Sequence, residues 1–299
     1  MKQMVGMNST SRKIFRSLNS VVLLTFAVLC VLPIWHVIMA SISDPLYVMS
    51  QSGIILFPKG ANTYGYQMIF RNKQILHSYG NTFIYVFSAT FIGMVITVMG
   101  AYALSRKNFL WSPPIMLGLT FTMLFSGGII PTYLVVKELG LYNTRWAVIL
   151  PMCVNTFNLI IIRTAMANIP PSLVESAELD GAGHMTILWK IILPLIKPTI
   201  ATVTLYYAVF HWNSWFNASI YLRNRADYPL QLVLKEILVG NDLTSVTSIS
   251  SDQAASSQEL SRELIKYCTI VVSTLPVFVF YPFVQKYFES GVMIGAIKG

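Results

Sequence analysis

The chain has 299 residues, of which 55% are apolar and only 11% are charged, and its formal net charge is +9. Soluble domains carry roughly 25% charged residues, so this composition cannot supply the charged surface that a soluble protein needs. The basic residues lie in short clusters beside apolar runs and form no basic stripe or RNA-binding signature, which argues against nucleic acid as a partner. The composition therefore indicates an integral membrane protein with lipid as its surroundings.

Six stretches are apolar and long enough to cross a hydrocarbon core about 30 Å thick, which takes about 20 helical residues. The first is longer than the apolar part of a cleaved signal peptide, so we expect it to stay in the membrane. The predicted fold class is all-α and integral to the membrane, with six transmembrane helices. Their expected positions are residues 21–42, 80–104, 112–135, 146–162, 199–221 and 264–284.

Basic clusters near helix ends predict the orientation, because Lys and Arg concentrate in cytoplasmic segments. One cluster precedes the first span and another, Arg106 and Lys107, follows the second. We expect both tails, residues 1–20 and 285–299, and the segment 163–198 to be cytoplasmic. The Ser-rich run 244–257 then belongs to a mobile outer loop.

The three cysteines predict packing rather than chemistry. Cys30, Cys153 and Cys268 each lie inside an apolar run, far apart in sequence and without metal-ligand spacing. We therefore expect no metal site in the chain.

The segment 170–198 looks structured, although it lies between two spans. Pro170 and Pro171 end the preceding helix, and Ser172 with Glu175 has the spacing of a capping box, which predicts a new short helix. Asp180-Gly181 should break that helix, because glycine tolerates left-handed geometry.

A second helix is predicted over residues 184–193, ending at Pro194. The pattern indicates a helix–turn–helix on the cytoplasmic surface. From these residues alone, an amphipathic hairpin that merely links two spans is equally consistent.

The same segment resembles the EAA motif of bacterial binding-protein-dependent ABC importer permeases. The resemblance lies in its position between the fourth and fifth of six spans, as in maltose-type permeases, and in the order of its residues. One departure is Ser176, where many members have Ala. The matching residues are Glu175-Ser176-Ala177, Asp180-Gly181-Ala182, Ile191-Ile192-Leu193-Pro194 and Pro198.

The resemblance implies a type I ABC importer transmembrane domain over residues 80–284, with an EAA loop at 170–198 that acts as a cytoplasmic coupling helix. In that family the short helix sits in a cleft of an ATPase subunit and transmits the closure of two ATPases to the spans. The residues implied in coupling are Glu175, Ser176, Ala177, Asp180, Gly181, Ala182 and His184.

The resemblance also implies partners. The chain has no G-x-x-x-x-G-K-[ST] loop, so it is not expected to be an enzyme, and ATP and Mg are expected on separate ATPase subunits. A second permease and an external solute-binding protein would complete the assembly in a bacterial inner or plasma membrane. Residues 283–299 resemble the tail of the maltose-type G permease, which reaches between the ATPases, although alone they would be an ordinary frayed tail.

Span five suggests a path for cargo. Tyr207, His211 and Trp215 have the spacing of one helix face, with Asn217 beside them, and aromatic faces with nearby amides suit sugars. These residues are equally consistent with packing between helices or with an aromatic belt. The pair Trp212-Asn213 resembles sugar permeases, which often follow it with an acidic residue where this chain has Ser214.

In span four, Asn155 and Asn158 would line the same path or hold helices together. Arg223 and Arg225, just beyond span five, are also consistent with an acidic oligosaccharide as the cargo.

The expected function is that of a permease subunit for a sugar or oligosaccharide in an ATP-driven importer. One alternative is the same importer class with an amino acid, phosphate or another solute as cargo. A second is a secondary carrier or channel without ATPase, which would call for buried carboxylates or basic groups inside the spans as ion-coupling devices, whereas the span cores contain almost no ionisable side chain. A membrane-anchored enzyme is a third, but the chain lacks a clustered nucleophile, a metal site or paired carboxylates.

Overall fold

A computed structural model describes residues 10–125, 127–239, 264–280 and 282, and within them all regular structure is helical. The chain divides into two compact units. Unit 1 comprises residues 1–72 and 243–272, and unit 2 comprises residues 73–242 and 273–299. The Ser-rich run 244–257 and the tail 283–299 lie outside the described residues.

Unit 1 consists of one long helix followed by short helices. Its helices are α1 (Thr10–Ser41), α2 (Pro45–Ser50), α3 (Tyr64–Arg71) and the first part of the helix Leu264–Phe280. The Asp44 carboxylate accepts a hydrogen bond from the backbone N–H of Leu46, so it caps α2. In the later helix, the Cys268 thiol is buried and donates to the carbonyl of Ser41.

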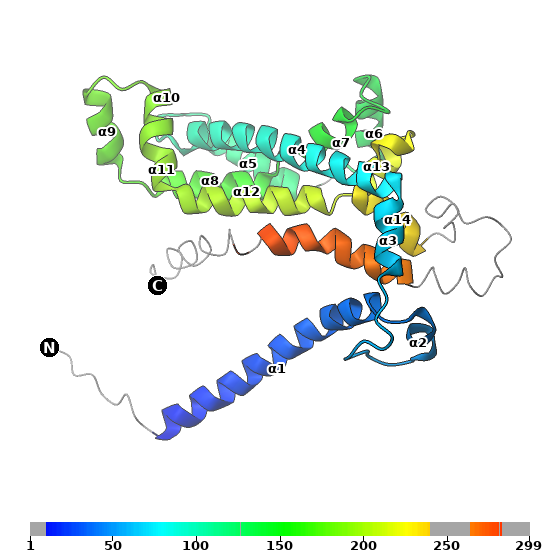
Figure 1. The fold of residues 1–299 in the computed structure, drawn as a ribbon. Helices are drawn as coiled ribbons and strands as arrows, with labels where there is room; N and C mark the ends of the chain where they lie inside the picture. The colour runs from blue at the N-terminus through cyan, green and yellow to red at the C-terminus, as the bar shows by residue number, and fades with distance from the viewer. Residues whose placement is uncertain (1–9, 126, 240–263, 281, 283–299) are drawn as a thin grey trace. The chain divides into compact units, whose positions relative to one another are not determined.

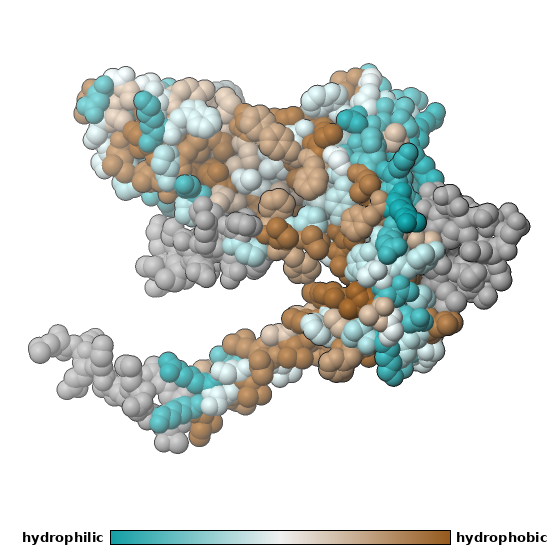
Figure 2. Space-filling view, in the orientation of Figure 1, coloured by the Kyte–Doolittle hydropathy of each residue, from teal (hydrophilic) through white to brown (hydrophobic). Residues whose placement is uncertain are grey.

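The described part of α1 is exposed on all sides over most of its length. Its 29 residues Lys13–Ser41 have a mean hydropathy of 2.5 in their most apolar window, and none of that window is buried. Apolar residues cover the middle of this helix in Figure 2. A helix that is apolar all round and unburied is typical of a membrane span. It begins at Thr10, earlier than the expected start of the span at residue 21.

Unit 2 holds the other helices (Figure 1). In chain order they are α4 (Lys73–Ser105), α5 (Ser112–Leu124), α6 (Ile129–Glu138), α7 (Trp146–Ile149), η1 (Leu150–Met152), α8 (Thr156–Ala167), α9 (Pro171–Leu179), α10 (His184–Thr186), the π-helical η2 (Ile187–Ile192), α11 (Leu193–Leu195), α12 (Lys197–Trp212), α13 (Phe216–Tyr221), η3 (Arg225–Asp227) and α14 (Leu230–Val239).

Three predicted spans are broken rather than continuous, and one of them, the expected helix 146–162, bends by 49° between η1 and α8. The expected helix 112–135 bends by 116° between α5 and α6, where Gly128 takes a left-handed φ of 89°. The expected helix 199–221 ends at Trp212. Asn213 follows as the C-cap residue, and both its backbone N–H and its side-chain amide donate to the carbonyl of Val209.

Three helices of unit 2 pack side by side: α4, α8 and α12 (Figure 1). Their shared core continues into the segment that joins α8 to α12. Ala101 of α4, Ile162 of α8 and Ile192 of η2 are all fully buried in one cluster. The long helix α4 therefore has the joining segment near its C-terminal end and α14 with η3 near its N-terminal end.

Gly93 of α4 lies against the backbone just before α8. A Cβ placed there would overlap the carbonyl oxygen of Cys153, which lies in the break between η1 and α8. Small residues let helices approach this closely inside a membrane protein. Glycine at this position is therefore a packing requirement of unit 2.

We expect Gly93→Ala to lower the free energy of unfolding by about 1–3 kcal/mol, because the added methyl group must push the two backbones apart. The thermal unfolding of the detergent-solubilised protein measures this loss. Gly118→Ala in α5 is the matched control, since nothing lies within 4 Å of a Cβ there. Equal unfolding temperatures for the two variants would contradict the assigned contact.

Candidate functional site

The joining segment turns sharply at Gly181, as the sequence predicted. Gly181 has a φ of 79°, and its N–H donates to the carbonyl of Glu178 at 3.0 Å. The next N–H, of Ala182, donates to the carbonyl of Ala177 at 2.9 Å. These two bonds form a Schellman motif, in which a left-handed residue ends the helix and satisfies its last carbonyls. The predicted helix–turn–helix is confirmed.

The predicted capping box at the start of α9 is wrong. The helix begins at Pro171, and its N-cap Pro170 has no side chain able to accept a hydrogen bond. Proline suits the first helical position because it lacks the N–H that would be unpaired there. Ser172 lies inside the first turn instead. The second helix also continues through Pro194 to Leu195 rather than ending at Pro194.

One face of this segment is fixed to unit 2. Ala177 is 9% exposed and joins the buried cluster of α4 and α8, and Ala182 packs against the same cluster. His184 is exposed, and its Nδ1 lies 3.3 Å from the hydroxyl of Tyr102 on α4. The guanidinium of Arg106 stacks over the Tyr102 ring at 4.4 Å. The segment therefore moves together with the C-terminal end of α4.

The other face is open to a partner. Glu175, Ser176 and Asp180 are exposed, and Leu179 is 89% exposed. This face of the turn is therefore not covered by any described part of the chain. Sequence reasoning missed Leu179, although an apolar residue directly before Asp180-Gly181 was a usable signal. The coupling role of these residues stays a prediction.

Two of the proposed pathway residues lie inside unit 2. Tyr207 is 1% exposed, and its hydroxyl bonds Thr97 Oγ1 at 2.8 Å and accepts from the Asn155 N–H at 2.9 Å. The His211 ring is 6% exposed and stacks on Tyr207 with centroids 6.3 Å apart. Tyr207 therefore joins α12 to its neighbours, whereas His211 stacks only on residues of α12 among the described residues, and its buried Nε2 has no hydrogen-bond partner there.

The three asparagines predicted to line the pathway differ in exposure. The Asn155 side chain is exposed and caps α8 by accepting from the N–H of Asn158 at 3.1 Å. Asn158 and Asn217 are 5% and 8% exposed. Of the three, only Asn155 is open to solvent.

Trp215 does not share a helix face with Tyr207 and His211, because α12 ends three residues before it. The predicted face over residues 207–215 is wrong for that reason. Trp215 is the N-cap residue of the short helix α13 and is half-buried. One face of its ring is covered by the ammonium of Lys235, whose Nζ lies 3.5 Å from the ring centroid.

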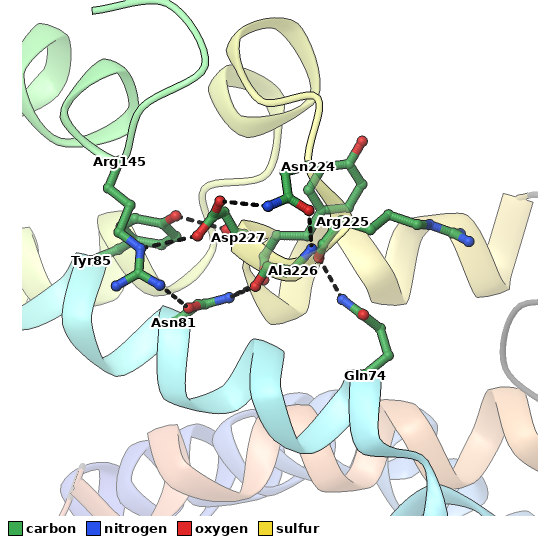
Figure 3. Close-up of polar contacts among 9 residues, drawn as sticks. Gln74, Asn81, Tyr85, Arg145, Asn224, Arg225, Ala226 and Asp227 are labelled. Carbon is green, nitrogen blue, oxygen red and sulfur yellow. Dashed lines mark hydrogen bonds and ion pairs between the residues drawn. The ribbon is translucent and has the colours of Figure 1, made fainter.

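A polar network binds the loop before α14 to the N-terminal part of α4 (Figure 3). Asn81, 2% exposed, donates through Nδ2 to the carbonyls of Ala226 at 2.6 Å and Tyr228 at 3.2 Å. The Tyr85 hydroxyl donates to the carbonyl of Asp227 at 2.7 Å. Backbone groups of an irregular loop thereby gain partners from one helix, which they need wherever water is scarce.

Two arginines complete this network. Arg145 donates to the carboxylate of Asp227 at 3.2 Å and to Asn81 Oδ1 at 3.2 Å. Arg225 pairs with Glu236 of α14 at 2.7 Å. Both pairs are partly exposed, so each contributes little to stability alone, and their effect is to fix the loop. Sequence reasoning missed Asn81 and Arg145, whose partners lie 64 to 147 positions away in the chain.

We expect Asn81→Ala to loosen this loop, because two of its carbonyls and the Arg145 guanidinium lose a buried partner. Trypsin cleavage after Arg223 or Arg225 should become about tenfold faster, as expected for a loss of about 1.4 kcal/mol in local stability. Peptide mapping over time measures the rate. In the control Asn213→Ala, an exposed amide on α12 is removed and the rate should not change. Equal rates in both variants would contradict the role of Asn81.

Known proteins resemble the chain over nearly its whole length. The family model described as "Binding-protein-dependent transport system inner membrane component" matches residues 73–250. The polygalacturonan/rhamnogalacturonan transport system permease protein YtcP of Bacillus subtilis (strain 168) is 42% identical, over 93% of this chain and 96% of its own. Protein LplC of the same organism is 37% identical, over 98% and 97%.

A solved structure supports the same assignment. It is that of a bacterial ABC transporter involved in the import of the acidic polysaccharide alginate. One of its chains is 33% identical to this chain and superposes with a TM-score of 0.84, over 95% of this chain and 100% of that one. The predicted fold class, the transmembrane domain of a type I ABC importer, is confirmed, as is a multi-pass location in the membrane. The chain belongs to the family of inner-membrane components of binding-protein-dependent transport systems.

Proposed function

We propose that the chain is one of two paired permease subunits of an ATP-driven importer, and that its cargo is an acidic oligosaccharide. The observation that supports an ATP-driven importer is the Gly181 turn. It presents Glu175, Leu179 and Asp180 to a partner while Ala177 stays in the core of the central helices. Such a turn can transmit the movement of an ATPase to α4, α8 and α12.

ATP and Mg belong to two separate ATPase subunits in this proposal. An exposed carboxylate such as Glu175 suits a basic group in the cleft of an ATPase, and Leu179 suits an apolar pocket beside it. The chain itself supplies docking and the path through the membrane. An external solute-binding protein delivers the cargo, in keeping with the family description.

The second permease has a suitable surface to contact. An open apolar groove of about 890 Å³ runs along unit 2, and its lining includes Phe87, Met94, Trp189 and Leu205. Groups this apolar need either lipid tails or another helix. We propose that helices of the second permease cover it.

Ion-coupled transport is a weaker explanation of the same helices. Residues 74–105 of α4 and 198–212 of α12 contain no Asp, Glu, Lys or Arg. Secondary carriers usually carry such groups in the membrane as coupling devices. The energy for transport is therefore assigned to ATP.

The acidic cargo is supported by two relatives. The permease of Bacillus subtilis is named for polygalacturonan and rhamnogalacturonan, and the related solved transporter for alginate, so both names specify acidic polysaccharides. The charge near the outer end of α4 agrees with such a cargo. Residues 137–145 and 223–236 hold five Lys or Arg against three Asp or Glu. A net positive mouth attracts anions by long-range electrostatics.

The orientation follows from this function, with both tails and the Gly181 turn in the cytoplasm. A single Cys replacing Ser250 should react with a membrane-impermeant maleimide in intact cells, whereas a Cys replacing Gly183 should react only after the cells are opened. Ser250 lies outside the described residues, and Gly183 is exposed beside the turn. The reverse labelling pattern would overturn the orientation.

The coupling proposal predicts the effect of Gly181→Ala and Glu175→Ala. A Cβ at Gly181 strains a left-handed residue by roughly 1–2 kcal/mol and tilts α9. Glu175→Ala removes one member of the proposed charge pair, and truncating one member of a buried interfacial pair costs about 2–5 kcal/mol. Both variants should insert normally and lose most ATP-dependent uptake. Uptake into proteoliposomes that contain the full importer measures the loss.

Gly183→Ala is the matched control, because Gly183 has an ordinary φ of −69° and nothing within 4 Å of a Cβ. It should transport like the unchanged protein. Normal uptake by both Gly181→Ala and Glu175→Ala would refute the coupling role.

A further inference from the structure

Lys235 of α14 and Trp215 form a cation–aromatic pair at the end of α12 that lies away from the Gly181 turn. The ammonium of Lys235 lies 3.5 Å from the centroid of the Trp215 ring, and both side chains are half-buried. The ring packs in turn against a buried cluster that includes Tyr85, Val148 and Leu232. An aromatic face attracts a cation and restricts its movement. The Lys235 charge is therefore held in a defined place.

The nearby carboxylates already have partners. Asp227 is paired with Arg145, and Glu236, next to Lys235 in the chain, is paired with Arg225. Among the residues that the structure describes, no carboxylate lies within ion-pair distance of Lys235. Within the described part of the chain, the group that faces this positive charge is the Trp215 ring.

Arg223 and Arg225 are less available to bind an anion than the sequence suggested. Arg225 is taken up by Glu236, and Arg223 donates from Nε to the hydroxyl of Tyr142 at 3.0 Å while it stacks over that ring at 5.3 Å. Lys235 has no hydrogen-bond acceptor of this kind among the described residues. It is the better placed cation for an incoming anion.

We propose that Lys235, held by Trp215, recognises the carboxylate of an acidic sugar as the cargo enters the pathway. The proposal rests on the proposed function and assigns its specificity to one residue. A lysine ammonium acts as a compact charge that can bind a carboxylate from several directions, which suits a cargo that must pass on. Because Lys235 covers one face of Trp215, the ring positions the ammonium there instead of offering that face for sugar stacking.

The test compares two cargoes in the assembled importer, with the same binding protein in every assay. One cargo is an oligogalacturonide, and the other is the same oligosaccharide with its carboxyl groups reduced to alcohols. Lys235→Gln should lower the uptake efficiency for the oligogalacturonide about tenfold and leave that for the reduced cargo unchanged. The ratio of the two efficiencies cancels any preference of the binding protein when variants are compared.

Two further variants show whether the charge is the cause. Lys235→Arg keeps a cation and should retain most of the preference for the acidic cargo. Lys107→Gln removes a different exposed cation, in the turn after α4 and outside the positive mouth, and should leave the ratio as it is. ATPase activity stimulated by the loaded binding protein should be normal in Lys235→Gln with the reduced cargo, which a folding defect would not allow.

Other outcomes refute the inference. Equal losses for both cargoes in Lys235→Gln would mean that Lys235 acts in folding or in docking the binding protein. An unchanged ratio would remove Lys235 from cargo recognition. If the unaltered importer took up neither oligosaccharide with ATP, the proposed function itself would fail.

Discussion

The hydroxyl of Tyr207 joins the three central helices of unit 2, and much of the structure depends on it. The side chain belongs to α12, bonds Thr97 on α4 and accepts from the Asn155 N–H at the start of α8. Within a membrane a polar group without a partner costs several kcal/mol, so a hydroxyl with two partners holds its helices in one register. The close approach of Gly93 to Cys153 occurs beside the same ring.

This tie explains how the ends of unit 2 can respond to one another. Gln74, near the start of α4, binds the loop before α14, and Tyr102, near its end, contacts His184. The two residues are 28 positions apart, or about 42 Å along a helix. Packed interiors deform little, so a push on α9 moves the central helices as a group rather than being absorbed locally.

The sequence predicted those features that depend on local chemistry. Hydropathy placed the apolar helices, and Asp180-Gly181 identified a left-handed turn that the structure contains. Sequence reasoning was wrong where a local pattern was consistent with more than one structure. Ser172 and Glu175 have the spacing of a capping box, yet Pro171 takes the first helical position. The apolar run 199–221 looked continuous, but α12 ends at Trp212 and a separate short helix begins at Phe216.

The polar network around Asn81 was beyond local reasoning for a different reason. Its partners Ala226 and Arg145 are far away in the chain, and nothing in the sequence near any of them signals the contact. The Lys235–Trp215 pair was equally hidden, because it depends on the break after α12 that hydropathy missed. Sites built on irregular backbone need the fold before they can be seen.

The arrangement of charges near the start of α4 follows a consistent physical logic. Arg145 neutralises Asp227 in the loop before α14, and Arg225 of the same loop neutralises Glu236 on α14, so the two pairs also fix the loop. Without those pairs, Asp227 and Glu236 would repel an anionic cargo. With them, the remaining field is positive, while the cation that faces the cargo is held by a ring rather than by an anion. A carboxylate arriving there displaces no ion pair, and it can leave again without a buried charge being left unpaired, which is what a transport pathway requires of its binding sites.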